Sequence, residues 1–404
     1  LTSLALRLVY DSRGQESIEA TVRADGGAEG VAGAPSGAST SAHEVRAFPE
    51  GGVAAALAQR RAIEAAISGI ELVDQAAVDA ALHAVDGTRD FSRIGGNTAT
   101  AISVATALAR AHAEGRPLAE VVRRPGAPAG RFPAIVGNCL NGGRHAIGGP
   151  DIQEFLAFAP EARPDDAVRA ALAVHRAVGK ALHERLPKAA LGRGDEGGWV
   201  AGVSNLEALE ILVSACRHAT EELGLKVRPG LDLAASEFFR DGRYRYREQT
   251  LDAEGQLGFV THLVEHFDLA YVEDPFDEED FESFARLTEA VGARTLVVGD
   301  DIYATDRERV ARGTAMRATN AVLIKVNQVG TLSDALATVD LARAEGQSTV
   351  TSHRSGELPE GWLAHLAVGF GSAGLKCGLL GGERVAKLNE LRRLGAATGS
   401  AHGT

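Results

Sequence analysis

The sequence predicts an α/β protein in which an N-terminal α+β domain precedes a barrel of alternating strands and helices. Three features of the 404 residues support this fold class. The chain opens with segments of alternating apolar residues and continues with Ala-rich helical stretches. A segment rich in proline and glycine follows. Beyond it, short apolar runs that end in a polar residue recur at nearly constant intervals.

Residues 1–125 are predicted to form the α+β domain. Apolar residues alternate along two segments on either side of a turn at 12–14, namely Leu4, Leu6 and Leu8, then Ile18, Ala20 and Val22. This pattern predicts an antiparallel meander up to about Gly30. A loop at 34–43 is expected to be mobile. Helices are expected at 52–69, 73–84 and 98–114, with Asn97 or Thr98 as the N-cap of the third.

The segment RRPGAPAGRFP is predicted to link this domain to a barrel that spans 130–404. The apolar runs of the barrel end at Asp232, Glu273, Asp300, Lys325, His353 and Lys376. From Glu273 onward these ends lie 27, 25, 28 and 23 positions apart, a length that fits one strand, one helix and two loops. One intervening helix is expected between a Thr/Ser cap at Thr331 and Gly346.

The composition excludes several classes of protein. The net charge of -12, without a basic stripe, argues against a nucleic-acid partner. No apolar stretch reaches the length of a membrane span, and the first residues lack the pattern of a signal peptide. Cys139, Cys216 and Cys377 are far apart and lack metal-ligand spacing, as is typical of free thiols in a reducing compartment. We therefore expect a cytoplasmic protein with a small-molecule ligand.

The polar ends of successive barrel strands should converge on one face. Asp232, Glu273 and Asp300 would place three carboxylates there, and such a cluster requires a neutralising cation. Oxygen ligands without His or Cys favour Mg²⁺, or Mn²⁺ in its place. The alternative is that these acids are helix caps and surface residues.

Lys325 and Lys376 also end apolar strands, which predicts that both face a polar cavity. Nearby positive charge lowers the pKa of a lysine, so one of them can act as a general base. A cation, a lysine base and a carboxylic acid together indicate proton abstraction next to a carboxylate, followed by loss of a β-group. The predicted enzyme class is a lyase. Within the stretch TSHRSGELPEGW, residues 353–356 taken alone favour a solvated turn over a functional site.

Eleven motifs identify the chain as similar to the enolase family along nearly its whole length. In order they are DSRG, PSGAST, NGGRHA, IQEF, GDEGG, GLDLAASEFF, VEDPFDEED, GDD, LIKVNQVGT, SHRSGE and ERVAKLNEL. The resemblance implies an enolase-type barrel whose second strand runs antiparallel, capped by the N-terminal domain. The spacing of the runs alone predicts an ordinary eightfold barrel. The implied activity is phosphopyruvate hydratase, which interconverts 2-phosphoglycerate and phosphoenolpyruvate.

The resemblance also implies roles for single residues. Lys325 is similar to the catalytic base of the family, and Glu196 to its acid, assisted by Glu154. Asp232, Glu273 and Asp300 resemble the ligands of a first Mg²⁺, and Ser39 a ligand of a second Mg²⁺ that arrives with the substrate. The groups that resemble those holding the phosphate and carboxylate of the substrate are Gln153, His145, His353, Arg354, Ser355, Lys376 and Ser39, with His353 also counted as catalytic. The alternatives are structural histidines at 145 and 353 and a helix-start pair at Gln153 and Glu154.

The chain departs from the family pattern near the expected pocket. Ser41 stands where glycine is usual, and Arg144 where a smaller or different residue is usual. The family pattern is also broken at 15–17, 358–361, 377–378 and 381–382. Arg144 and the 358–361 loop motivate a second hypothesis, an enolase-like carboxyphosphonoenolpyruvate synthase of phosphonate biosynthesis. A third hypothesis is a non-catalytic binding protein. The resemblance finally implies a homodimer or higher oligomer, with Glu19 and Arg393 paired across the interface.

Overall fold

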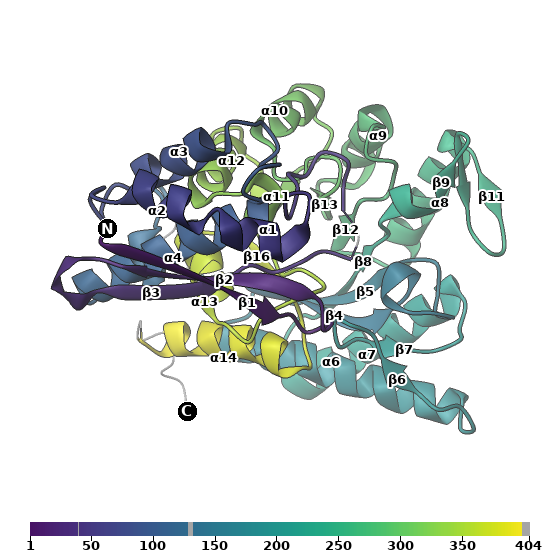
Figure 1. The fold of residues 1–404 in the computed structure, drawn as a ribbon. Coiled ribbons are helices and arrows are strands. Elements are labelled where there is room, and N and C mark those ends of the chain that lie inside the picture. Colours follow the sequence, from purple (N-terminus) through teal and green to yellow (C-terminus); the bar gives the residue numbers. More distant parts are fainter. Residues whose placement is uncertain (39, 128–131, 398–404) are drawn as a thin grey trace.

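The computed structural model describes residues 1–38, 40–127 and 132–397. The N-terminal sheet is an antiparallel meander of β1 (Ser3–Tyr10), β2 (Glu16–Arg23) and β3 (Glu29–Gly33), as predicted (Figure 1). The two alternating apolar sets face each other in register, since Leu4 pairs with Val22 and Leu8 with Ile18. The Asp11 side chain closes the turn between β1 and β2, because its Oδ1 accepts from the backbone N–H groups of Arg13 at 2.8 Å and Gln15 at 2.9 Å.

Helices cover one face of this sheet. They are α1 (Gly52–Ala58), α2 (Arg60–Ile67), α3 (Gln75–Asp86), α4 (Gly96–Glu114) and α5 (Leu118–Val121), with a 3-10 turn η1 (Asp25–Gly27) between β2 and β3. The helix expected at 52–69 is therefore divided at Gln59. The long α4 lies directly on the sheet, and a Cβ at Gly30 would stand 2.0 Å from the Ala105 carbonyl oxygen, so only glycine permits this approach.

The predicted N-cap of α4 is wrong. Asn97 and Thr98 lie buried inside the first turn, and the capping position is Gly95, which has a φ of 86° and no side chain to donate or accept. The first-turn N–H groups are satisfied differently. Those of Gly96 and Asn97 donate to the carbonyls of Arg46 at 2.7 Å and Ala47 at 3.0 Å. A neighbouring loop therefore replaces a side-chain cap.

The barrel strands are β4 (Ala134–Asn141), β5 (Glu154–Phe158), β8 (Arg228–Asp232), β12 (Tyr271–Glu273), β13 (Leu296–Gly299), β14 (Ala321–Ile324), β15 (Ser348–Ser352) and β16 (Gly374–Gly378). They follow this order around the barrel, and β16 pairs with β4 to close it. Strand β5 is antiparallel to both β4 and β8, and the other barrel neighbours are parallel. The enolase-type topology is confirmed, and the ordinary eightfold barrel is wrong.

The outer layer of the barrel consists of α6 (Pro164–Arg185), α7 (Asn205–Leu223), α8 (Ala253–His266), α9 (Phe281–Val291), α10 (Arg307–Met316), α11 (Val326–Val329), α12 (Leu332–Ala344), α13 (Trp362–Gly369) and α14 (Gly382–Ala397) (Figure 1). Short elements decorate the loops, namely η2 (Gly143–His145), β6 (Gly192–Arg193), β7 (Trp199–Val200), η3 (Ala235–Phe238), β9 (Phe239–Arg240), β10 (Arg243–Arg245) and β11 (Thr250–Leu251). The predicted cap of α12 is confirmed, because Thr331 accepts from the Asp334 N–H at 3.2 Å.

Apolar side chains fill the inside of the barrel at the end opposite the polar strand ends. This plug is formed by Ala134, Val136, Leu156, Phe158, Ala270, Tyr271, Val298, Ala321, Leu323 and Val350, each at most 3% exposed. Polar groups inside the barrel are therefore confined to the end where Asp232 and Glu273 lie. Among the helices the structure describes, none has the length and hydropathy required to span a bilayer.

The two domains meet where three of the quoted motifs touch. The Ser36 N–H donates to the Gly356 carbonyl at 2.8 Å, and the Gly356 N–H donates back to Ser36 at 2.8 Å. Ser36 Oγ also donates to Asp11 Oδ2. A Cβ at Gly356 would stand 2.1 Å from Asp11 Oδ2 and 2.2 Å from Ser36 Oγ. Glycine is required at 356 because any side chain would separate these contacts.

The 358–361 loop belongs to this domain joint. Leu358 is 6% exposed and packs on Gly33, at the end of β3. Glu360 accepts from the Gly33 N–H at 3.0 Å and from Trp362 Nε1 at 2.5 Å. The loop therefore ties β3 to the barrel.

Glu360 should make stability depend on pH. Burial raises its pKa from 4.5 to about 7, although the hydrogen bonds from Gly33 and Trp362 oppose this. The folded state thus holds the proton more tightly than the unfolded chain, and the resulting stabilisation is lost as pH rises from below 4.5 through about 7. Relative to the Glu360→Gln variant, the wild type should lose up to about 3 kcal/mol of unfolding free energy between about pH 5 and about pH 8.5.

Urea unfolding of both proteins at the two pH values measures this difference. The exposed Glu71→Gln exchange is the matched control and should give no such change. A wild-type-to-Glu360→Gln difference that stays constant with pH would contradict the prediction.

Candidate active site

A cavity of about 310 Å³ opens at the end of the barrel where the polar strand ends meet. Its lining consists of Gly37, His145, Gln153, Glu154, Glu196, Asp232, Asp300, Lys325, Ser352, His353, Arg354, Ser355 and Lys376. The structure thus brings together nearly all site residues that the sequence predicts. Glu273 is fully buried and lies against this set through Lys376. Ser39 lies outside the described residues.

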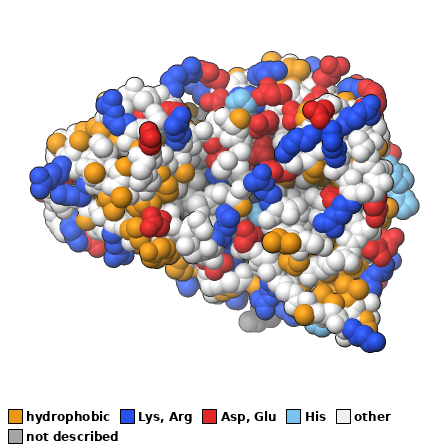
Figure 2. Space-filling model, turned by 45° about the vertical axis from the view of Figure 1, so that its right-hand side comes forward, with side chains coloured by type: hydrophobic (Ala, Val, Ile, Leu, Met, Phe, Trp, Pro, Cys, Tyr) orange, Lys and Arg blue, Asp and Glu red, His pale blue; other side chains and the backbone are white. Residues whose placement is uncertain are grey.

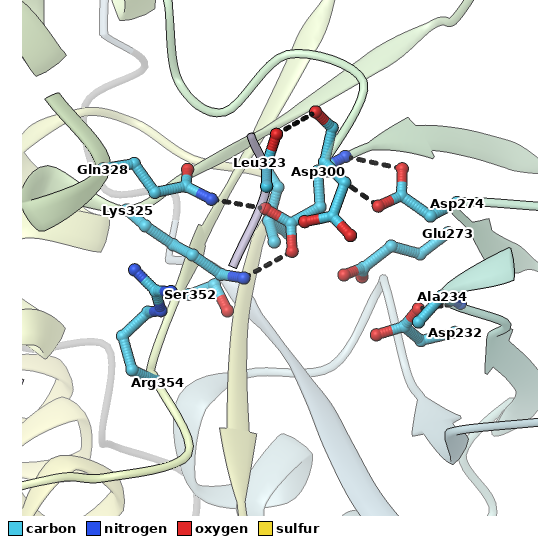
Figure 3. Close-up of polar contacts among 12 residues, drawn as sticks. Asp232, Ala234, Glu273, Asp274, Asp300, Leu323, Lys325, Gln328, Ser352 and Arg354 are labelled. Atoms are coloured by element: carbon cyan, nitrogen blue, oxygen red, sulfur yellow. Dashed lines mark hydrogen bonds and ion pairs between the residues drawn. The ribbon is translucent and has the colours of Figure 1, made fainter. Parts of the chain in front are cut away.

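The carboxylates of Asp232, Glu273 and Asp300 face the same space from the ends of three adjacent strands, β8, β12 and β13 (Figure 3). Lys376 lies among the acids. Its Nζ is 2.7 Å from Asp232 Oδ2, 2.7 Å from Glu273 Oε1 and 3.0 Å from Glu154 Oε1. One ammonium can balance the charge of only one of these three buried carboxyl groups. The strand does not end at this lysine as expected, because β16 continues to Gly378.

The protonation and the donor atoms of these acids indicate whether they can bind a cation. Burial, and then the charge of Asp232, raise the pKa of Glu273 to about 8. Glu273 thus holds a proton that a dication would displace. The oxygen-only donor set also fits Mg²⁺. A second acidic group adjoins it, since Asp274, Asp300 and Asp301 have oxygens within 4.8 Å of one another. The residues present fit a divalent metal.

Asp274 fixes the turn after β13. Its Oδ1 accepts from the Asp300 N–H at 3.0 Å and its Oδ2 from the Asp301 N–H at 2.7 Å (Figure 3). Asp274 itself has a φ of 41°, in the left-handed region, which directs its side chain back to this turn. The orientation of Asp300 is therefore set by backbone contacts as well as by its side chain.

Lys325 immediately follows β14 and points at the acidic end of the barrel. Its Nζ donates to Asp300 Oδ2, and Gln328 Nε2 donates to Asp300 Oδ1 at 3.0 Å (Figure 3). Burial and the charges of Arg354 and Lys376 lower the pKa of Lys325, but the Asp300 carboxylate outweighs them and raises it. Lys325 is consequently an ammonium as long as Asp300 is its counter-ion.

Glu196 and Glu154 form a pair with opposite protonation. Burial by itself would raise the pKa of both carboxyl groups. At Glu196 the charges of His145 and Arg384 and the nearby His353 ring outweigh burial and lower the pKa well below its usual range. At Glu154 the charge of Glu196 adds to burial and the pKa rises well above its usual range. These opposite pKa shifts favour the proton of the pair on Glu154 over Glu196.

Two histidines flank Glu196. His353 Nε2 is 3.3 Å from Glu196 Oε2, and His145 Nε2 is 3.6 Å from Glu196 Oε1. Asn138 Nδ2 donates to Glu196 Oε2 at 3.0 Å. Burial lowers the pKa of His353 to about 4, so this ring is neutral. Its Nδ1 accepts from Arg384 Nη1 at 2.6 Å, which leaves the proton on Nε2, directed at Glu196.

Arg354 carries a buried ion pair with the N-terminal domain. Its Nη1 and Nη2 lie 3.0 and 3.1 Å from the two oxygens of Glu44, and Nη1 also donates to Asn327 Oδ1 at 2.9 Å. Ser355 Oγ, next in sequence, accepts from the Ala38 N–H at 2.5 Å. Residues 352–355 (SHRS) therefore place a guanidinium at the cavity and also bind the loop that contains Ala38. The solvated-turn alternative is wrong.

Arg144 does not lie on the cavity lining. Its side chain is 54% exposed, and its Nε donates to Glu237 Oε2 at 2.6 Å. Among the described lining residues, none comes from 358–361 either. The two departures that suggested extra anion contact and extra room thus lie beside the site.

Sequence reasoning missed several residues that position the site. Arg384, in α14, is fully buried and donates to His353 and to the carbonyls of Arg354 and Ser355, both at 2.6 Å. Glu44, Asn327 and Gln328 were missed as well. The only available signal was indirect, since Arg384, Asn327 and Gln328 fall inside the quoted motifs ERVAKLNEL and LIKVNQVGT.

Comparisons with known proteins cover nearly the whole chain. A family model described as the enolase N-terminal domain matches residues 1–122, and one described as the enolase C-terminal TIM barrel domain matches residues 131–403. The enolase of Natronomonas pharaonis is 46% identical over 403 residues, which is 98% of this chain and 99% of that protein. The enolase of Methanothermobacter thermautotrophicus is 45% identical, with 98% and 96% covered, and that of Picrophilus torridus 40%, with 96% of each covered.

Removing the ammonium among the acids should destabilise the metal-free protein. The Lys376→Met variant leaves Glu154, Asp232 and Glu273 buried without their cation, and we expect a loss of about 3–5 kcal/mol in EDTA. Millimolar Mg²⁺ should restore part of this loss, because a dication can take the place of the ammonium.

Thermal and urea unfolding with EDTA and with Mg²⁺ measure both effects. Lys180→Met removes a lysine that is 80% exposed and serves as the control, with an expected change within about 0.5 kcal/mol. Equal stability of Lys376→Met and wild type in EDTA would show that the acids need no internal cation.

Proposed function

The chain belongs to the enolase family, and from this premise we propose that it is a phosphopyruvate hydratase, a carbon–oxygen lyase that dehydrates 2-phosphoglycerate to phosphoenolpyruvate. The observation that carries the proposal is the content of one cavity. A lysine, a pair of carboxyl groups with opposite protonation, a set of acids that fits a dication and a guanidinium all line it. The reaction needs a base, an acid and cationic groups for phosphate and carboxylate.

We propose that Asp232, Glu273 and Asp300 hold a first Mg²⁺, and that Ser39 contributes to a second that binds with the substrate. Bound at these residues, Mg²⁺ would stabilise the negative charge that develops on the substrate carboxylate. The support is the proton that Glu273 retains and the shared direction of the three carboxylates (Figure 3).

Lys325 is proposed to remove the proton from carbon 2. Arg354 and Lys376 lower its pKa, and Asp300 is the carboxylate that opposes them. The amine becomes available when the charge of Asp300 is engaged by another partner, since burial and the two neighbouring cations then favour the neutral form. The electrons of the carbon–hydrogen bond become the double bond between carbons 2 and 3.

The acid is proposed to be the Glu196–Glu154 pair. The hydroxyl on carbon 3 leaves as water and needs a proton, and the pair shares one that the opposite pKa shifts favour on Glu154. Glu196 would face the leaving hydroxyl, with His353 as a neutral donor beside it. His145 lies on the other oxygen of Glu196 and is proposed to close this side of the site.

The anionic groups of the substrate are proposed to bind at the opposite part of the lining. Arg354 can hold phosphate through two parallel N–H donors, and Ser355 lies beside it. Lys376 is proposed for the carboxylate. Gln153 lines the cavity with an Oε1 that is buried and has no hydrogen bond among the described residues. It is proposed to contact substrate. Nothing in the structure favours the phosphonate-pathway or non-catalytic hypotheses, because Arg144 is paired with Glu237 and the 358–361 loop joins the domains.

We further propose a division into domains at 1–125 and 130–404, a cytoplasmic location and at least a homodimer. The three cysteines are buried free thiols, in keeping with a reducing compartment. The outer face of the N-terminal sheet offers a dimer surface, on which Val31 is 39% exposed. Figure 2 shows hydrophobic side chains on the tapering lobe at its left. Arg393 pairs with Glu390 and is 68% exposed, so a partner could engage it, whereas Glu19 is 12% exposed and pairs with Arg7 at 2.5 Å.

The activity is tested with purified protein, Mg²⁺ and 2-phosphoglycerate, by the ultraviolet absorbance of the enol product. Lys325→Met should lose about 10³-fold or more of kcat and also lose exchange of the carbon-2 proton with deuterated solvent. Glu196→Gln should lose about as much turnover but retain exchange, because the base acts before the acid is required.

Lys180→Met should retain full activity as the control, and EDTA should abolish turnover reversibly. A Mg²⁺-loaded wild type that forms no enol product would refute the proposed function. Retained carbon-2 exchange in Lys325→Met would instead reassign the base.

The assembly is tested by light scattering. We expect the mass of at least two chains, and Arg393→Glu should weaken the dimer by about tenfold or less, since an exposed ion pair contributes little. Arg392→Glu, one residue away and 52% exposed, is the matched control. A monomeric wild type at micromolar concentration would overturn the proposed assembly.

A further inference from the structure

Three side chains within four residues of the N-terminal domain reach across to the barrel. Ser41 Oγ lies 2.5 Å from Glu278 Oε2, His43 Nε2 lies 2.6 Å from Glu279 Oε1, and Glu44 pairs with Arg354. The barrel partners follow β12 and β15, two different strands. We call residues 41–44 the docking segment.

Ser41 makes the closest contact with the barrel in this segment. It is 7% exposed. Its hydroxyl has one proton, which goes to the near oxygen of Glu278, while the Asp301 carbonyl at 3.1 Å is the next acceptor. Ser41 Oγ also accepts from the His43 N–H at 3.2 Å. Hydrogen bonds to an ionised acceptor are the stronger ones, and this one is shielded from water.

The acceptors of Ser41 are themselves held in place. The backbone of Glu278 is held at both of its polar groups. Its N–H donates to Ser236 Oγ at 2.9 Å, and its carbonyl accepts from Arg309 Nη2 at 2.7 Å. The Asp301 N–H is fixed by Asp274 at 2.7 Å. Ser41 is thus attached to a part of the barrel whose backbone is held by further hydrogen bonds within the protein.

Glu44 transmits this attachment to the cavity. Both of its oxygens contact Arg354, with side chains only 7% and 3% exposed, and Gln328 Nε2 lies 3.3 Å from Glu44 Oε1. Gln328 also holds Asp300, as Figure 3 shows. If the docking segment left the barrel, Arg354 would lose its bidentate partner and with it one of the contacts that orient the guanidinium.

We propose that Ser41 is a positioning residue that fastens the docking segment to the barrel before substrate binds, so that Glu44 presents Arg354 in the orientation required by the substrate's phosphate. The inference rests on the proposed function for its kinetic part. A glycine, which the family pattern has at this position, could make none of the side-chain contacts of Ser41. Substrate binding here therefore does not need to order this segment, and preorganisation of this kind lowers KM.

The test compares Ser41→Ala and Ser41→Gly with Ser68→Ala, an exposed serine of the same domain. Both Ser41 variants should raise KM for 2-phosphoglycerate about tenfold and leave kcat within about twofold, because the lost bond must be compensated on binding. In the substrate-free protein, hydrogen exchange of the amides of residues 43–46 should become about tenfold faster. Ser68→Ala should change neither quantity.

A double-mutant cycle with Glu278→Ala identifies the contact responsible. Glu278→Ala alone should resemble Ser41→Ala, and the double variant should be no worse than either single one. The proposal would be overturned by additive effects of the two substitutions. It would also be overturned by unchanged amide hydrogen exchange of residues 43–46 in Ser41→Ala and Ser41→Gly. If the wild type does not turn over 2-phosphoglycerate, the proposed function fails, whereas exchange in the substrate-free protein still decides the role of Ser41.

Discussion

Mutual neutralisation of ionised side chains, buried at one end of the barrel, is the constraint on which the rest of the molecule depends. Lys376 lies among three carboxyl groups, Arg354 pairs with Glu44, and Lys387 Nζ lies 2.9 Å from Glu357 Oε2. Buried pairs of this kind add little net stability, because desolvation offsets attraction, but an unmatched partner is costly. They therefore select one arrangement of strands and loops, and with it one arrangement of the cavity.

The barrel strands and the loops that follow them cannot satisfy these charges alone. Glu44 comes from the N-terminal domain, while Arg384 and Lys387 come from the last helix, α14. Arg384 fixes the tautomer of His353 by donating to its Nδ1, and so directs the other ring nitrogen at Glu196. The last helix thus determines the tautomer of a ring that lies outside it. The site therefore draws side chains from both domains and from the closing helix.

Much of the fold followed from local pattern, and the failures have physical reasons. Apolar runs that end in Asp, Glu, Lys or His predicted which residues converge, because parallel strands align their carboxyl ends. Pattern could not reveal that β5 runs backwards, since its alternation reads alike in either direction; only the family resemblance did so. The cap of α4 was misassigned because carbonyls of Arg46 and Ala47, outside the helix, satisfy its first turn. Glu44 was missed because its partner Arg354 is 310 residues away.

The contact of Asp11, Ser36 and Gly356 leaves no room for even a methyl group at the glycine. Three chain segments that lie far apart in the sequence are therefore joined by close packing and hydrogen bonds at one place. An exchange of the N-terminal domain with that of a relative would succeed only if all three positions matched at once. The geometry of this contact therefore restricts which N-terminal domains could recombine with this barrel.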